Sequence, residues 1–208
     1  MIQFRFIALV IIVLSIYSCG NTESSDANSK EGSATKDTTA IEHTDTVITS
    51  QPKKLLSPRK IARGNTVVGE IEVDYGAPSV RGREVWGELV PYDTLWRAGA
   101  NETTAITFEK AVSIGGVKLE SGTYSYFIVP SKEDKWTIII NTKWHKDKHD
   151  MWGTYGYDEA NDVVRVEVEP NWREDAVEVL NYSVEEDGSI IMHWEKVSLS
   201  LPVSVPSE

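Results

Sequence analysis

Cysteine is almost missing from the 208-residue chain, which holds only Cys19. One cysteine excludes an internal disulfide, so an exported domain built by this chain depends on its hydrophobic core. Basic residues are also scarce, because 21 Lys and Arg stand against 32 Asp and Glu, for a formal net charge of −11. An acidic chain without a basic stripe argues against nucleic acid as a partner and against electrostatic adhesion to anionic lipid.

No apolar run spans a bilayer comfortably. The run Phe6–Ile16 follows a single basic residue, Arg5, and is typical of the core of a signal peptide. We therefore predict that residues 1–18 form a signal peptide that is separate from the folded domain. The alternative is an uncleaved N-terminal anchor.

The end of this segment predicts a lipid anchor. Ser18 precedes Cys19, which resembles the bacterial lipobox, where a small residue stands before the cysteine that is lipidated. An ordinary secretory signal with an incidental cysteine is the alternative. Gly20 follows the cysteine, and by resemblance to bacterial sorting rules this favours anchoring at the outer membrane or cell surface over retention at the inner membrane.

Aromatic residues and apolar periodicity are absent from residues 19–54, which are rich in Ser, Thr, Asp and Glu. Such a composition cannot offset the entropy of ordering, so we predict a disordered tether. A flexible chain of this length has an r.m.s. span of about 30 Å. The remaining residues, 55–208, are enough for one domain with its own core.

Helical periodicity is lacking in that domain, and a period of two dominates from residue 66 onward. We expect about nine strands in an all-β fold, a β-sandwich or jelly roll, with a closed barrel as the alternative. The run "KWTIIIN" predicts a strand covered on both faces, and Glu186-Asp187-Gly188 predicts a hairpin turn. The pattern also predicts a bulge near Gly69 and a separate last strand, "VSLSLPVSV".

One block, "RGREVWGELVPYDTLWRAGANETT", makes the domain resemble the family known as domain of unknown function 2911. The resemblance extends over residues 56–205. It implies a secreted or lipid-anchored bacterial protein, and it brings no established activity.

Arg97 is the most informative residue of this block, because the small residues that follow it leave its guanidinium open to close approach. One hypothesis is bidentate recognition of a carboxylate, phosphate or sugar. The other is a structural arginine paired with Glu102, Asp158 or Asp162. In either case we expect Trp96 to be buried, and Asn101 to adopt a left-handed turn conformation.

The same block places two more arginines close to a tryptophan, and together these side chains are typical of a polar, stacking pocket. A solvated connecting loop is the alternative. The candidate ligand-binding residues are Arg81, Arg83, Trp86, Trp96, Arg97, Asn101 and Glu102.

Metal and cofactor motifs are absent. His145 and His149 have chelating spacing only on a helix, which nothing here indicates, so we predict no metal site and no cofactor. His193 is interpreted as a structural histidine. We expect a non-catalytic module that binds a glycan or small anionic ligand. The alternatives are an envelope hydrolase with Glu102 or Asp158 as acid or base, and an accessory subunit of an envelope complex.

Overall fold

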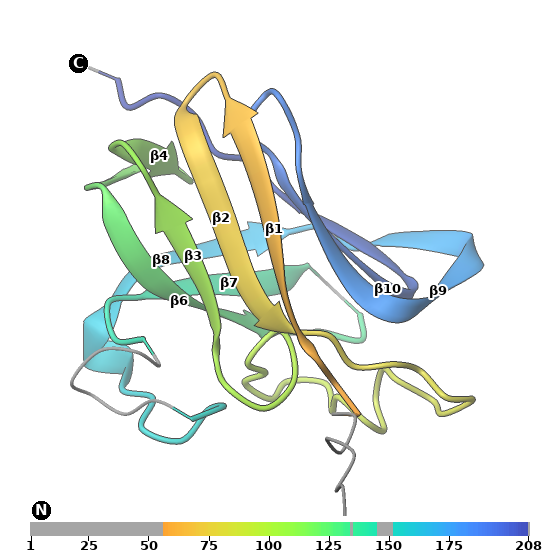
Figure 1. The fold of residues 1–208 in the computed structure, drawn as a ribbon. Helices are drawn as coiled ribbons and strands as arrows, with labels where there is room; N and C mark the ends of the chain where they lie inside the picture. The colour runs from red at the N-terminus through yellow and green to blue at the C-terminus, as the bar shows by residue number, and fades with distance from the viewer. Residues whose placement is uncertain (1–55, 134, 145–151, 208) are drawn as a thin grey trace, which may run out of the picture. The chain divides into compact units, whose positions relative to one another are not determined.

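Antiparallel strands build almost all of the regular structure that the computed structural model describes, which covers residues 56–133, 135–144 and 152–207 (Figure 1). These residues lie in one unit, Ser50–Glu208. The predicted signal peptide, Cys19 and the tether lie outside the described residues, as do His145 and His149. Within the described residues, no helix is long and apolar enough to cross a membrane.

The first layer is a six-stranded sheet in the order β1-β2-β3-β6-β7-β8. Its strands are β1 (Arg59–Thr66), β2 (Gly69–Gly76), β3 (Thr104–Phe108), β6 (Gly122–Val129), β7 (Trp136–Asn141) and β8 (Asp162–Val168). All neighbouring strands in it are antiparallel.

The second layer is a hairpin of two long strands, which crosses one face of the large sheet in Figure 1. Its strands are β9 (Asn171–Val184) and β10 (Ile190–Leu201). The smaller elements are β4 (Val112–Ile114), β5 (Val117–Leu119) and a single turn of 3-10 helix, η1 (Glu159–Asn161). The fold is therefore all-β, as predicted, with two layers arranged as a β-sandwich.

The main core lies between the two layers. Ile71 and Ile138 from the sheet belong to the same buried cluster as Leu180 and Met192 from the hairpin. Burial alternates along β10 on each side of a slip at Glu195-Lys196, because every second side chain in these two stretches points into this core. β7 carries the "WTIIIN" run and is covered on both faces as expected, since Ile139 belongs to a second cluster on the outer face.

Three local expectations were wrong. β1 was not predicted, because its sequence "RKIARGNT" is basic and Ile61, its one large apolar residue, is 51% exposed. The irregularity near Gly69 is the turn of the β1–β2 hairpin and not a bulge within one strand. The predicted last strand is the continuation of β10, which runs without a break to Leu201.

Two register shifts interrupt the second layer, one between His193 and Glu195 and one between Glu195 and Val197. Trp172 pairs with Val197 and Val177 pairs with Glu195, so that residues 173–176 of β9 face a single residue of β10. Glu195 has a left-handed backbone with φ of 52°, which is uncommon for a residue other than glycine. The bulge ends the regular pairing next to Trp172 and turns that part of β9 toward solvent.

Candidate functional site

A long loop, residues 77–103, connects β2 to β3 and covers one end of the sandwich (Figure 1). It contains the whole block that carries the candidate residues. Two backbone hydrogen bonds fix its middle to the sheet, since Trp96 exchanges N–H···O bonds of 2.8 and 2.9 Å with Ile128 in β6. The loop is therefore held as firmly as a strand at this point.

Tryptophan rings fill the space under the loop. Trp96 is buried, with 8% of its surface exposed, which confirms the prediction. Its ring stacks on Trp194 of β10 at 5.6 Å between centroids, and Trp86 contacts both rings edge-on. Trp86 also packs on Trp136 at 4.6 Å. These rings serve as core packing and are too buried to serve as platforms for sugar rings.

The small residues after Arg97 are explained by backbone packing. Ala100 donates a hydrogen bond to the carbonyl of Gly76, and a Cβ atom added at Gly76 would overlap the carbonyl oxygen of Ala100. Ala98 and Asn101 both have left-handed backbones, with φ of 53° and 64°, as predicted for Asn101. The loop makes two sharp changes of direction here, which only small or short polar residues tolerate easily.

Because of these changes of direction, Glu102 lies beside Arg59 and does not pair with Arg97. Arg59 of β1 donates to the Asp74 carboxylate at 2.7 Å, and its guanidinium lies 3.6 Å from the carboxylate of Glu102. It also donates to the backbone carbonyls of Asp74, Glu102 and Thr103. The structural arginine of this corner is therefore Arg59.

Arg97 makes none of the ion pairs that were predicted for it. Asp158 pairs with Lys143, and Asp162 pairs with Arg165 at 2.7 Å. Within the described residues, the Arg97 side chain has no hydrogen bond or ion pair, and its buried Nε atom has no partner. Removal from water lowers the pKa of this guanidinium from its ordinary value.

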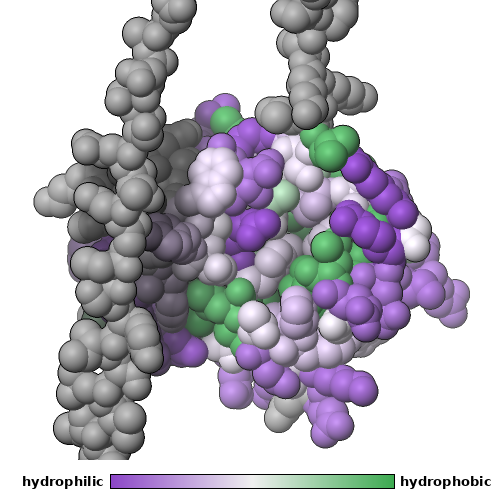
Figure 2. Space-filling model, turned by 90° about the horizontal axis from the view of Figure 1, so that it is seen from below, coloured by the Kyte–Doolittle hydropathy of each residue, from purple (hydrophilic) through white to green (hydrophobic). Residues whose placement is uncertain are grey.

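Arg97 instead lines a cavity of about 290 Å³ between the loop and β10, which we call the Arg97 cavity. Figure 2 views the molecule from below, onto the loop-rich end, where apolar surface is bordered by hydrophilic residues. The guanidinium lies beside Gly153, where an added Cβ would be 3.3 Å from Nη1. The lining residues are Ser57, Pro78, Arg83, Leu89, Val90, Trp96, Arg97, Gly99, Ala100, Asn101 and Trp194.

Four of the seven candidate residues meet at this cavity, namely Arg83, Trp96, Arg97 and Asn101. Arg83 donates to the carbonyls at positions 79 and 80, and Asn101 donates to the carbonyl of Ser57, so both are held in place.

The other three candidates lie elsewhere. Arg81 lines a separate apolar cavity and donates to the carbonyl of Leu56. Trp86 lines a neighbouring cavity, and Glu102 pairs with Arg59. Trp194 also lines the Arg97 cavity but was not among the predicted site residues. Its strand pattern does not indicate that β10 lies beside the loop.

Among the residues that the structure describes, no acidic group lines the Arg97 cavity. Asp158 is exposed, and a hydrogen bond from the backbone of Ala160 lowers its pKa. Tyr157 donates to Asp162, and burial together with that carboxylate raises the pKa of Tyr157 to about 12. Among the residues that the structure describes, no group of three or more His, Cys, Asp or Glu side chains is placed to hold a metal ion.

One comparison with known proteins identifies a family. The family model described as "Protein of unknown function (DUF2911)" matches residues 57–203, which is nearly the whole folded domain. No curated protein and no solved structure matches the chain.

Proposed function

Since the chain belongs to this family of proteins of unknown function, we propose its role from geometry and sequence: it is a lipid-anchored cell-envelope domain whose Arg97 cavity binds a small anionic ligand without catalysing a reaction. The observation that carries the proposal is Arg97, which lines the cavity and whose partly buried side chain includes an Nε atom with no partner among the described residues. A planar guanidinium in that state fits a bidentate carboxylate or phosphate.

The partial burial of the Arg97 charge favours an anionic ligand. A partly desolvated charge without a counterion is unfavourable, and an anionic ligand would remove this cost. Arg83, on the same cavity wall, adds a second positive charge. Two charge-assisted hydrogen bonds of about 2 kcal/mol each correspond to a dissociation constant on the order of 1 mM, before any contribution from the apolar walls.

The size and walls of the cavity support a small ligand. Its volume of about 290 Å³ is at the lower end of the range for small-molecule sites. Leu89, Val90 and Trp96 supply apolar contacts beside the guanidinium. The ligand that fits is therefore a compact carboxylate or phosphate with a short apolar part.

The hydrolase alternative lacks a comparable observation. It needs Glu102 or Asp158 beside Arg97, but these carboxylates are paired with Arg59 and Lys143. The binding proposal uses only groups that lie together at the cavity.

The decisive experiment compares the Arg97→Lys variant with wild-type protein. The probes are acetate, lactate, succinate and inorganic phosphate at up to about 10 mM, well above the expected dissociation constant. Binding is followed by tryptophan fluorescence, because Trp96 and Trp194 line the cavity. We expect at least one probe to saturate wild type and to bind at least about tenfold more weakly to the variant, since an ammonium lacks the planar fork.

Arg63→Lys is the matched control. Arg63 is an exposed arginine of β1 that pairs with Glu72 of β2, and it does not line the cavity. The thermal midpoints of both variants should stay near that of wild type. If no probe binds, and Arg97→Lys lowers the midpoint, the proposed function is wrong and Arg97 has a structural role.

The envelope location has its own test. Cys19→Ser should release the protein from the membrane fraction or block its processing, because the lipobox-like end of the signal peptide depends on that thiol. A Ser variant that matures normally and remains with the membrane would contradict the lipid anchor while leaving the cavity proposal intact.

A further inference from the structure

An exposed tryptophan lies on the second layer, outside the Arg97 cavity. Trp172 is 53% exposed, the highest exposure among the ring-stacked tryptophans. It meets buried Trp136 edge-on, with 6.4 Å between centroids and 86° between ring planes. The edge contact positions the ring and leaves indole surface open to solvent, where it is available to a ligand.

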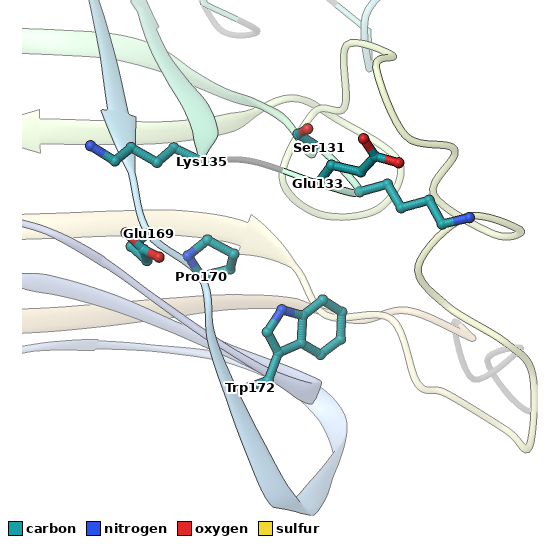
Figure 3. A pocket seen from close by; sticks show the side chains of 7 residues that line it. Ser131, Glu133, Lys135, Glu169, Pro170 and Trp172 are labelled. Atoms are coloured by element: carbon teal, nitrogen blue, oxygen red, sulfur yellow. The ribbon is translucent and has the colours of Figure 1, made fainter.

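A cavity of about 250 Å³ opens on one side of this ring. Figure 3 shows Trp172 and Pro170 facing Ser131 and Glu133 across it. The side chains around it are mostly polar, and among the described lining residues two lysines, Lys132 and Lys135, stand beside two glutamates, Glu133 and Glu169.

A second cavity, of about 290 Å³, lies against the same tryptophan. Its charged residues also balance, since Arg83 and Lys196 are matched by Glu84 and Glu195. Trp172 is the lining residue that the two cavities share. A chain-like ligand that lies across the indole could therefore reach both cavities.

We propose that the Trp172 surface, formed by Trp172 and these two cavities, binds a neutral oligosaccharide. The apolar C–H face of a pyranose ring covers an indole well, and its hydroxyl groups both donate and accept hydrogen bonds. Lysine ammonium groups donate hydrogen bonds and glutamate carboxylates accept them, so the described lining residues supply both kinds of partner. The two cavities correspond to sugar units on either side of the unit that stacks on Trp172.

Charge balance separates this surface from the Arg97 cavity. An anion would be repelled by the glutamates around Trp172 about as strongly as it is attracted by the lysines, and a cation would meet the reverse. A neutral, hydroxyl-rich ligand avoids both penalties. Among the described residues, the lining of the Arg97 cavity contains Arg83 and Arg97 and no carboxylate, so it suits an anion, although Arg83 also lines the second cavity beside Trp172.

The β9 bulge explains how Trp172 reaches its position. The four residues 173–176 face the single residue Lys196 of β10 and end the regular ladder beside Trp172, and the neighbouring Glu195, which pairs with Val177, has the left-handed backbone. Bulges and strained backbones concentrate at sites where a side chain must be re-aimed. The bulge therefore serves to present the indole between the two cavities.

The test uses the full-length protein and four neutral hexasaccharides, namely maltohexaose, cellohexaose, mannohexaose and xylohexaose, at up to about 10 mM in isothermal titration calorimetry. We expect at least one to bind wild type. Trp172→Ala should weaken that binding at least about tenfold, and Trp172→Phe should retain part of it, because a smaller aromatic face remains.

Trp152→Ala is the matched control, because Trp152 is similarly exposed but lines neither cavity. It should bind the sugar like wild type, and Trp172→Ala should keep wild-type affinity for small anions, so the two proposals fail independently. Failure of all four sugars to bind, or unchanged binding by Trp172→Ala, would overturn the oligosaccharide site, whatever the Arg97 cavity binds.

Discussion

The Arg59→Met substitution should lower the free energy of unfolding by about 3 kcal/mol. Methionine keeps an apolar stem of similar length but removes every hydrogen-bond donor. The Asp74 carboxylate, whose side chain is only 10% exposed, loses the cation 2.7 Å away, and the carbonyls of Glu102 and Thr103 lose their donors. Arg97→Met, by contrast, should change the free energy of unfolding by less than about 0.5 kcal/mol.

The magnitude follows from the burial of the pair. Removing one partner of a fully buried ion pair costs about 3–5 kcal/mol. The Arg59 side chain is 25% exposed, so water screens part of the interaction and the lower end applies. For a domain of about 150 residues, 3 kcal/mol corresponds to a fall in thermal midpoint of about 6–12 °C.

Urea denaturation of both variants measures these differences directly. A double-mutant cycle with Asp74→Asn isolates the ion pair, and the two changes together should cost less than the sum of the single changes. If Arg97→Met destabilises the domain as much as Arg59→Met does, the division into one structural and one ligand-binding arginine is refuted.

Three further outcomes are expected. Gly76→Ala should cost about 2 kcal/mol in urea denaturation, because its Cβ would overlap the Ala100 carbonyl, whereas Gly116→Ala in an open turn should cost less. Burial and the nearby Arg173 lower the pKa of His193. The unfolded chain therefore takes up protons first as pH falls through about 6.5, so acidification to about pH 5 should destabilise wild type more than His193→Gln; an equal loss would contradict this. A chelator should leave the thermal midpoint unchanged, and a drop of several degrees would reveal a metal site.

Local patterns were sufficient for most of the strands. The alternation along β10 and the Glu186-Asp187-Gly188 turn predicted the hairpin of β9 and β10, though not the full length of its strands, because each signal depends on residues close in sequence. β1 escaped detection because an edge strand that buries little apolar surface carries little periodic signal. Its pairing with β2 is specified by the turn and the ladder more than by its side chains.

The sequence predicted several residues of the candidate site but not the contacts that these residues make. Proximity along the chain made Glu102 the natural partner of Arg97. The left-handed residues Ala98 and Asn101 turn the loop so that Glu102 meets Arg59 instead. Arg59 and Glu102 are 43 residues apart in the sequence, and Arg59 lies on a strand that was not predicted. Their pairing could therefore not be inferred from the block itself. The contribution of Trp194 depends in the same way on how β10 packs against the loop.

The pairing of β1 has a mechanical consequence. The described residues begin at the end of the sandwich that carries the Arg97 cavity and finish at the opposite end (Figure 1). Tension between these two ends would pull β1 along its own length, from Arg59, against β2. All eight paired positions from Arg59↔Gly76 to Thr66↔Gly69 would then share the load in shear instead of opening one after another. The edge strand β1, whose sequence has little hydrophobic periodicity, would therefore resist separation from β2 when the preceding chain is pulled.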